Sequence, residues 1–486
     1  MGVIIISSIT RTALIGVAVS LYALSTFTGS AAAHAFGLRY DLPMALAFYL
    51  TGAGAAVALS FVIMALFIRR HQTDIAPNPI DLLQFPPIGW LGHRLSLGVT
   101  RLLSVAIFWL VLSAAIFGID DPFDNLAPTF VWVVWWVGMA FVSALIGNLW
   151  ELVNPWKIIA GWVTRIRPPR AYPSALAQWP AVLMFFAFAW MELIGERTEQ
   201  PAILAMLIIT YSLITWSGMA IYGSRTWLDK ADAFSIVFGI LSKFAPTCGT
   251  AGHWNLRAPA VGLLARQPAD VSSIAFVVLL LTTVTFDGIL ETPLWADILE
   301  WVAENQFLRP LLVFLQDAGV DLIGLLKTSA LIVLPFIFFA VYLAFCGLVA
   351  LAGGGRIPVI EVAGYFILSL VPIAAAYHLS HYLSYLLIAG QNIIPLASDP
   401  FGVGWNLFGT AGYQIDLGIV TAKMVWIVAV CAIVTGHVFA VYVAHVMALR
   451  VFPDRRAALR SQIPMLVLMV GYTMISLWIL SQPVVS

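Results

Sequence analysis

Charged side chains are scarce in this sequence. Only 10% of its 486 residues are Asp, Glu, Lys or Arg, whereas 61% are hydrophobic. This balance is far from that of soluble domains and excludes an ordinary water-soluble protein. The 24 basic residues are balanced by 24 acidic residues. A chain with zero net charge has no bulk basic field, so we expect no nucleic-acid partner.

Cysteine and long polar segments are scarce as well. The three cysteines, Cys248, Cys346 and Cys431, lie far apart and form no CxxC pair. They therefore predict no disulfide framework. No polar stretch is long enough for a separate soluble domain. We expect residues 34–486 to form a single polytopic helical domain in the lipid bilayer, because lipid offers backbone groups no other partner.

Long apolar runs are abundant and predict an all-α fold with about 10–12 transmembrane helices. A shorter apolar piece, 233–246, cannot cross a membrane and predicts a re-entrant or interfacial helix. The amphipathic, acidic stretch 294–325 is expected to lie along one membrane face. The ten clearest spans are 43–68, 99–118, 128–150, 174–195, 201–222, 271–290, 326–352, 358–390, 418–450 and 464–482.

The first 33 residues pose a separate question. Arg11 precedes an apolar run that ends in SAAAHA, a small-residue pattern typical of a signal-peptidase site. Residues 1–33 are thus either a cleaved signal peptide or an uncleaved first transmembrane helix. Cleavage after Ala33 would make His34 the N-terminal residue, whose amine and imidazole together can chelate copper.

The distribution of charge predicts an orientation. If 69–98 is cytoplasmic and the spans alternate, 18 of the 24 basic residues fall on the inner side. The acidic stretch 287–321 then falls on the outer side. This asymmetry follows the positive-inside rule, and it predicts an extracytoplasmic C-terminus. No internal repeat is visible, which argues against an inverted-repeat transporter.

Four of the eight histidines lie inside two long apolar helices. His378 and His381 are three residues apart and share a helix face, as do His437 and His445, eight residues apart. Ionisable groups at membrane depth are costly and indicate a functional site. The orientation places His378, His381 and His437 at comparable depth, with His445 nearer the inner face. The three could bind a metal or haem, or each could simply hydrogen-bond to a neighbouring helix.

Two carboxylates lie near the outer end of 271–290. Asp287 and Glu291, in TVTFDGILETPLW, are four residues apart and share one face. With histidine partners, Asp287 would complete a mixed nitrogen and oxygen site suited to zinc, manganese or iron. Glu291 is either a general base or part of a solvated helix end. Lys327 and Lys423 could pair with these carboxylates or extend to the interface.

Other polar residues predict no chemistry. Asn148, Glu151 and Asn154 mark a helix end before Pro155, with Trp150, Trp156 and Trp162 expected in the aromatic belt at the membrane interface. His71 and His93 lie in inner-face sequence, and His253 lies in a predicted loop, TCGTAGHWNLRAP. The AGGGR segment at 352–356 lacks the lysine and serine of a phosphate-binding loop.

Two segments carry a family resemblance. HAFGLRYDLPMALAFYLTG at 34–52 and WLDKADAFSIVFGILSKFAP at 227–246 resemble a family of bacterial integral membrane proteins known as fenitrothion hydrolases. The resemblance extends along most of the chain. It implies a bacterial inner-membrane location and cleavage of apolar aryl phosphorothioate triesters such as fenitrothion. It supplies no catalytic residues.

Three functions remain open at this stage. The first is a metal-dependent phosphotriester hydrolase, with His378, His381, His437 and Asp287 as ligands and Glu291 and Asp287 in catalysis. A bound divalent ion would lower the pKa of its water and polarise the phosphoryl group. The second is a haem- or copper-binding membrane oxidoreductase. The third is a proton- or ion-coupled transporter that uses the same buried ionisable groups.

Overall fold

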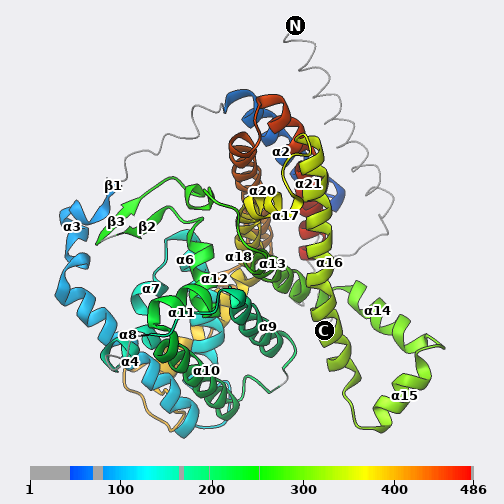
Figure 1. The fold of residues 1–486 in the computed structure, drawn as a ribbon. Coiled ribbons are helices and arrows are strands. Elements are labelled where there is room, and N and C mark those ends of the chain that lie inside the picture. Colours follow the sequence, from blue (N-terminus) through cyan, green and yellow to red (C-terminus); the bar gives the residue numbers. More distant parts are fainter. Residues whose placement is uncertain (1–43, 69–79, 164–168, 196, 251, 483–486) are drawn as a thin grey trace. The chain divides into compact units, whose positions relative to one another are not determined.

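The computed structural model describes residues 44–68, 80–163, 169–195, 197–250 and 252–482. Within these residues, ten helical segments are long and apolar enough to cross a membrane. The protein is therefore an all-α polytopic membrane protein, as the sequence predicted (Figure 1). The predicted signal peptide and His34 lie outside the described residues, as does His71.

All ten predicted spans coincide with helical segments. The last helix begins nine residues before its predicted window, because Asp454 caps a polar first turn by accepting the Ala457 N–H. Three spans combine several shorter helices. The single-helix segments are α2 (Leu46–Phe67), α4 (Arg94–Phe117), α10 (Pro201–Tyr222), α13 (Val271–Leu290), α16 (Leu322–Ala352), α20 (Ala422–Val451) and α21 (Arg455–Leu480). The first two composite segments are α5 (Leu126–Pro128), η4 (Thr129–Val137) and α6 (Gly138–Leu145), and then η5 (Ser174–Leu176) and α9 (Trp179–Leu193). The last composite segment is α17 (Val359–Phe366), η7 (Ile367–Leu370), α18 (Val371–Ile388), η8 (Ala389–Asn392) and α19 (Ile393–Ser398).

Shorter elements connect these spans. The amphipathic stretch 294–325 contains two short helices, α14 and α15, before α16 begins. The apolar piece 233–246 forms α12, whose residues are almost all buried. The short elements are η2 (Leu82–Gln84), α3 (Pro86–Gly89), η3 (Trp90–Gly92), α7 (Trp150–Val153), α8 (Pro155–Val163), α11 (Ser224–Lys230), α12 (Ala233–Ser242), η6 (Val261–Leu263), α14 (Pro293–Glu304), α15 (Arg309–Asp317) and η9 (Leu417–Ile419).

A small antiparallel sheet replaces the predicted loop around His253. Strands β1 (Ile80–Asp81), β2 (Thr247–Thr250) and β3 (His253–Leu256) lie in the order β1-β3-β2. The loop prediction was wrong because Gly252, at a φ of +86°, closes a tight turn between two very short strands. Asp81 joins the sheet by accepting hydrogen bonds from the Trp254 N–H and from His253. The His253 hydrogen bond lowers the pKa of Asp81.

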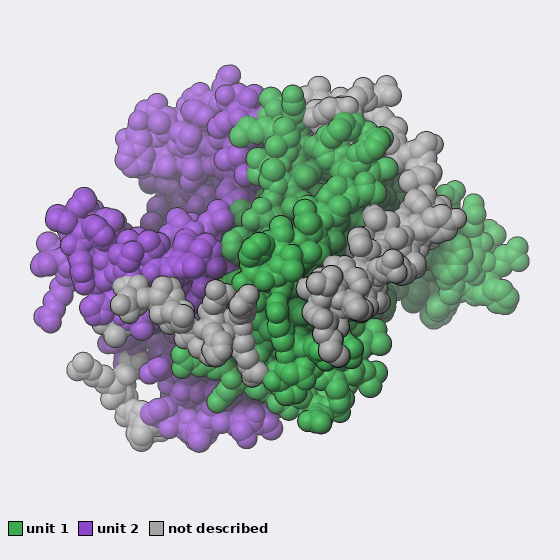
Figure 2. Space-filling view, turned by 90° about the horizontal axis from the view of Figure 1, so that it is seen from above, with its two compact units in different colours: residues 1–76, 263–381, 421–486 green, residues 77–262, 382–420 purple. Residues whose placement is uncertain are grey.

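The chain divides into two compact units (Figure 2). Among the described residues, unit 1 comprises 44–68, 263–381 and 421–482, and unit 2 comprises 80–163, 169–195, 197–250, 252–262 and 382–420. The prediction of one membrane domain stays a prediction, since compactness alone does not show independent folding.

Unit 1 is built around α13, α20 and α21. α13 is buried along most of its length, and α2 packs mainly against α20 and α21. Small residues allow close helix approach, as is usual in membranes. A Cβ added at Gly54 of α2 would lie 3.3 Å from Val470 of α21. One added at Gly436 of α20 would lie 2.5 Å from the Ala376 Cβ of α18. This second approach brings α20 close to the histidine-bearing part of α18.

Unit 2 contains four apolar spans and the buried helix α12. α12 contacts α6, α9 and α11, and α10 contacts α4 and α8. Its η4 segment, TFVWVVWWV, is a nine-residue π-helix. π-Helical turns are rare and occur frequently at functional sites. This segment and the helices around it carry most of the aromatic residues of unit 2.

Candidate functional site

A half-buried ion pair joins two spans of unit 1. Asp287 lies in the last turn of α13, and His381 lies in α18. The Nε2 atom of His381 is 2.9 Å from the Oδ2 atom of Asp287. Their side chains are only 11% and 19% exposed, respectively. The two residues that the sequence predicted to converge therefore lie together. Because an ionisable pair inside apolar helices is costly, the pair is a candidate functional site.

More ionisable groups surround the pair. Glu291, one residue beyond the end of α13, is exposed and interacts electrostatically with both Asp287 and His381. His378, 5% exposed, interacts electrostatically with the same two residues from one turn away on α18. Glu291 and His378 are therefore each within electrostatic range of the pair. Exposure decreases from Glu291 through Asp287 and His381 to His378.

Two tyrosines extend this group and were not predicted from the sequence. Tyr377 is fully buried, and its ring stacks on that of His381 with centroids 6.4 Å apart. Its hydroxyl lies against Gly288, since a Cβ added there would be 2.7 Å from the Tyr377 Oη. No described residue forms a hydrogen bond with that hydroxyl. The second tyrosine, Tyr472 of α21, shares a hydrogen bond with Thr285 of α13.

His437 continues this polar group on α20. Its ring lies 6.1 Å from that of Tyr472, between centroids. Its Nδ1 atom is 2.8 Å from the Ile433 carbonyl oxygen. Because a carbonyl only accepts, Nδ1 carries the proton and Nε2 presents a lone pair when the ring is neutral. That Nε2 is buried and has no hydrogen-bond partner among the described residues. It is therefore available to accept a proton or to bind a ligand.

The other predicted participants lie apart from the pair. His445 is hydrogen-bonded through Nδ1 to the Oε1 atom of Gln462 on α21, at 2.7 Å. Lys327 and Lys423 form no ion pair within the described part of the chain. The ion pair of Asp287 is with His381 rather than with either lysine. His93 acts as a helix cap, since its Nδ1 accepts the Leu95 N–H at the start of α4.

The donor set fits a metal only in part. Asp287 and His381 supply an oxygen and a nitrogen close together, and His437 has a free Nε2. However, the described residues contain no group of three or more His, Cys, Asp or Glu side chains arranged to hold an ion. Metal centres in proteins ordinarily use three or four such ligands. The site with His378, His381, His437 and Asp287 as ligands stays a prediction.

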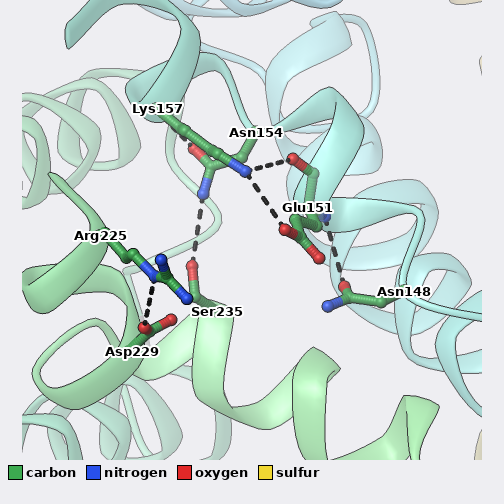
Figure 3. A network of polar contacts seen from close by, with 7 residues as sticks. All are labelled: Asn148, Glu151, Asn154, Lys157, Arg225, Asp229 and Ser235. Atoms are coloured by element: carbon green, nitrogen blue, oxygen red, sulfur yellow. Dashed lines mark hydrogen bonds and ion pairs between the residues drawn. The ribbon is translucent and has the colours of Figure 1, made fainter. Parts of the chain in front are cut away.

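The segment around Asn154 in unit 2 is a structural junction. Asn154 separates α7 from α8, as predicted, and caps α8 by accepting the Lys157 N–H (Figure 3). Its Nδ2 reaches Ser235 of α12, while Lys157 pairs with Glu151 at 3.6 Å. Asn154 is buried, whereas the side chains of Lys157 and Glu151 are exposed, and exposed ion pairs contribute little to stability. We assign them no chemistry.

The tryptophans of this segment correct the interface prediction. Trp150 and Trp156 are 3% and 7% exposed and pack inside unit 2, whereas Trp162 is exposed. An indole with one polar atom suits both an interface and a core that supplies a hydrogen-bond acceptor. Trp156 finds one, because its Nε1 donates to the Ser212 hydroxyl at 2.8 Å.

Comparisons with protein-family models, with curated proteins and with solved structures found no match to this chain. Function is therefore argued from the site.

Proposed function

We propose that unit 1 conducts protons through the membrane along a path that includes Asp287 and His381. The observation that carries the proposal is the Asp287–His381 pair, two ionisable side chains 2.9 Å apart within apolar spans. Carboxylate and histidine series inside membrane helices are the usual components of proton relays. A histidine takes up and releases protons near neutral pH, and a neighbouring carboxylate adjusts that tendency.

The order of groups along unit 1 supports a path. It begins at the exposed Glu291, continues to Asp287 and His381, and reaches Tyr472 and His437 through Thr285. His445 lies eight residues further along α20, roughly 12 Å at 1.5 Å per residue. If the candidate spans α16, α17–α19 and α20 each cross once, Glu291 and His445 lie toward opposite sides of the membrane.

We expect Asp287→Asn to abolish proton movement. The amide keeps the shape of the carboxylate but cannot bind a proton in this range, so the path loses its central acceptor. Full-length protein would be placed in vesicles that contain a pH-sensitive dye, and a potassium diffusion potential would drive protons inward. The variant should acidify the vesicles roughly tenfold more slowly than the wild type, or no faster than vesicles without protein.

Asp297→Asn is the matched control. Asp297 is an exposed carboxylate on α14 in the same unit, outside the spans, and its loss should leave the rate unchanged. Wild-type vesicles that acidify no faster than protein-free vesicles would contradict the proposal. An Asp287→Asn rate equal to that of the wild type would contradict it equally.

The same pair also favours a second candidate, hydrolysis of an apolar phosphotriester. A histidine oriented by a carboxylate is a common arrangement for a general base. His381 would take a proton from water, the hydroxide would attack phosphorus, and the aryloxide would leave. This candidate joins the pair to the resemblance of residues 34–52 and 227–246 to the fenitrothion hydrolases. With a divalent metal, His378, His381, His437 and Asp287 would be the ligands, and Glu291 would serve as a base.

Hydrolysis makes its own prediction. His378→Ala should abolish nitrophenol release from fenitrothion in membranes that hold normal amounts of the protein. Full activity in this variant would remove the metal-site version of the candidate. Metal analysis and a visible spectrum of the purified protein separate a colourless zinc hydrolase from a haem or copper oxidoreductase, which would absorb visible light. Proton flux without nitrophenol release would leave only the transport proposal.

A further inference from the structure

Unit 2 contains a cavity that the proton path does not use. Its volume is about 580 Å³, within the range of ligand pockets in proteins. The lining residues come from α4, η4, α6, α7, α8, α9, α10 and α12, all of unit 2. We propose that this cavity binds a neutral aromatic small molecule that partitions into membranes. The inference is independent of the chemistry at Asp287 and His381.

The wall of the cavity is aromatic. Nine of its 26 lining residues are Phe, Trp or Tyr, whereas aromatic residues make up 13% of the chain. Several of these rings pack against one another. Trp135 meets Phe234 edge to face at 4.5 Å, and Trp132 stacks on Phe188 at 5.6 Å, between centroids. Rings fixed in this way offer preformed faces and edges, which favour another aromatic ring over a flexible acyl chain.

The hydroxyls of Ser104, Thr210 and Tyr211 in the wall are already occupied, whereas the buried indole Nε1 atoms of Trp132, Trp135 and Trp150 have no hydrogen-bond partner among the described residues. Ser104 donates to the Val153 carbonyl, and Thr210 donates to the Met206 carbonyl. Tyr211 donates to Asp232, which is fully buried. These hydroxyls have no remaining donor for a ligand. No Lys, Arg, Asp, Glu or His lines the cavity. A charged ligand would find no group of opposite charge there, so the ligand is neutral.

The cavity can be reached from the lipid-facing surface of its helices. Leu103 and Ile107 of α4 and Ile214 of α10 line it and are also exposed. Both helices are membrane spans. A ligand dissolved in the bilayer therefore has a route that avoids water.

The cavity also includes an unusual backbone element. The π-helix η4 contributes Phe130, Val131, Trp132 and Trp135 to the wall. A π-helix places side chains differently from an α-helix, and π-helical turns occur frequently at functional sites. Met139, Met184 and Met191 complete the lining, and their sulfur atoms adapt well to aromatic partners.

Photolabelling with benzophenone tests the proposal. Benzophenone is a neutral aromatic molecule that, when excited, inserts into C–H bonds beside the methionine sulfur. We expect the label on Met139, Met184 and Met191 of the full-length protein in lipid nanodiscs. Met206 and Met424 are 60% and 50% exposed and lie outside the cavity, so they report labelling from bulk lipid. Excess fluorene added before irradiation should prevent labelling of the cavity methionines, whereas a linear alkane of similar volume should not.

Two neighbouring leucines provide a matched pair of variants. Leu103 lines the cavity and Leu102 does not, although both lie on α4 and are largely exposed. Leu103→Trp should fill the cavity and lower the label on its methionines roughly tenfold, because overfilled sites lose ligand contacts. Leu102→Trp should leave it unchanged. Labelling that depends only on the exposure of each methionine would overturn the proposal. Labelling that the alkane prevents as well as fluorene does would also overturn it and would indicate a lipid chain as the occupant.

Discussion

Gly436→Ala is expected to destabilise unit 1 and to separate α18 from α20. The added Cβ would lie 2.5 Å from the Ala376 Cβ and 2.6 Å from the Pro372 carbonyl oxygen. The carbonyl is backbone and cannot turn aside, so the two helices must move apart. Overpacking of this kind costs about 1–3 kcal/mol, and sometimes more. A lowered melting temperature of the purified protein in detergent would show it.

The same substitution should impair the site. His437 is the next residue on α20, so a shift of that helix changes the position of its imidazole relative to Tyr472. Proton flux in vesicles is therefore expected to fall together with stability. Gly347→Ala on α16 is the control, because no atom lies within 4 Å of the added Cβ. A Gly436→Ala protein that melts at the wild-type temperature would mean that α18 and α20 are not in such close contact.

Asp232→Ala is expected to unfold much of unit 2. The carboxylate is fully buried at the start of α12, where it accepts hydrogen bonds from Tyr211, Ser235 and the Phe234 N–H. Alanine leaves these donors unpaired, and each buried unpaired donor costs about 1–3 kcal/mol. Asp232→Asn keeps an acceptor oxygen and should fold. Trypsin sensitivity of the purified variants would distinguish the two outcomes.

Asp229→Ala tests whether the effect is specific to the buried position. Asp229 lies three residues earlier on α11, and its exposed side chain pairs with Arg225. Its removal should change stability by less than about 0.5 kcal/mol. If Asp229→Ala and Asp232→Ala were equally sensitive to trypsin, the importance of the buried carboxylate would be refuted.

The Asp232 carboxylate also predicts a dependence on pH. Burial raises its pKa above the usual 3.8, although the hydrogen bonds from Tyr211 and Ser235 oppose the shift. The folded state therefore holds this proton more tightly than the unfolded state does. Stability from this group is fully present below the unfolded pKa and is lost as pH rises through the folded pKa. The melting temperature of the wild type should thus fall relative to that of Asp232→Asn over this range.

The spans were predictable because length and apolarity alone define them. α10 and α13 begin and end at the residues that the sequence predicted. Pro201 and Asp270 mark those starts, since proline suits a first helical turn and aspartate caps one. The π-helical geometry of η4 was not predictable, because its sequence is simply apolar.

The candidate site was predictable only in part. Asp287 and His381 were identified because a charged group is conspicuous in an apolar helix. Tyr377, Tyr472 and Thr285 were missed, since hydroxyl residues are ordinary in membrane helices and carry no such signal. Their role depends on which helices are neighbours, and apolar periodicity does not predict which helices pack together.

The pairing of α2 with α20 and α21 has a consequence during synthesis. α2 is the first described helix, and its packing partners are the last two. At 5–20 residues per second, roughly 20 to 80 s pass between the emergence of α2 and that of α21. Throughout that interval, the α2 surface that contains Gly54 faces lipid or an insertion factor rather than Val470. A nascent chain that ends before α21 therefore leaves this α2 surface uncovered, and quality-control proteases can recognise it.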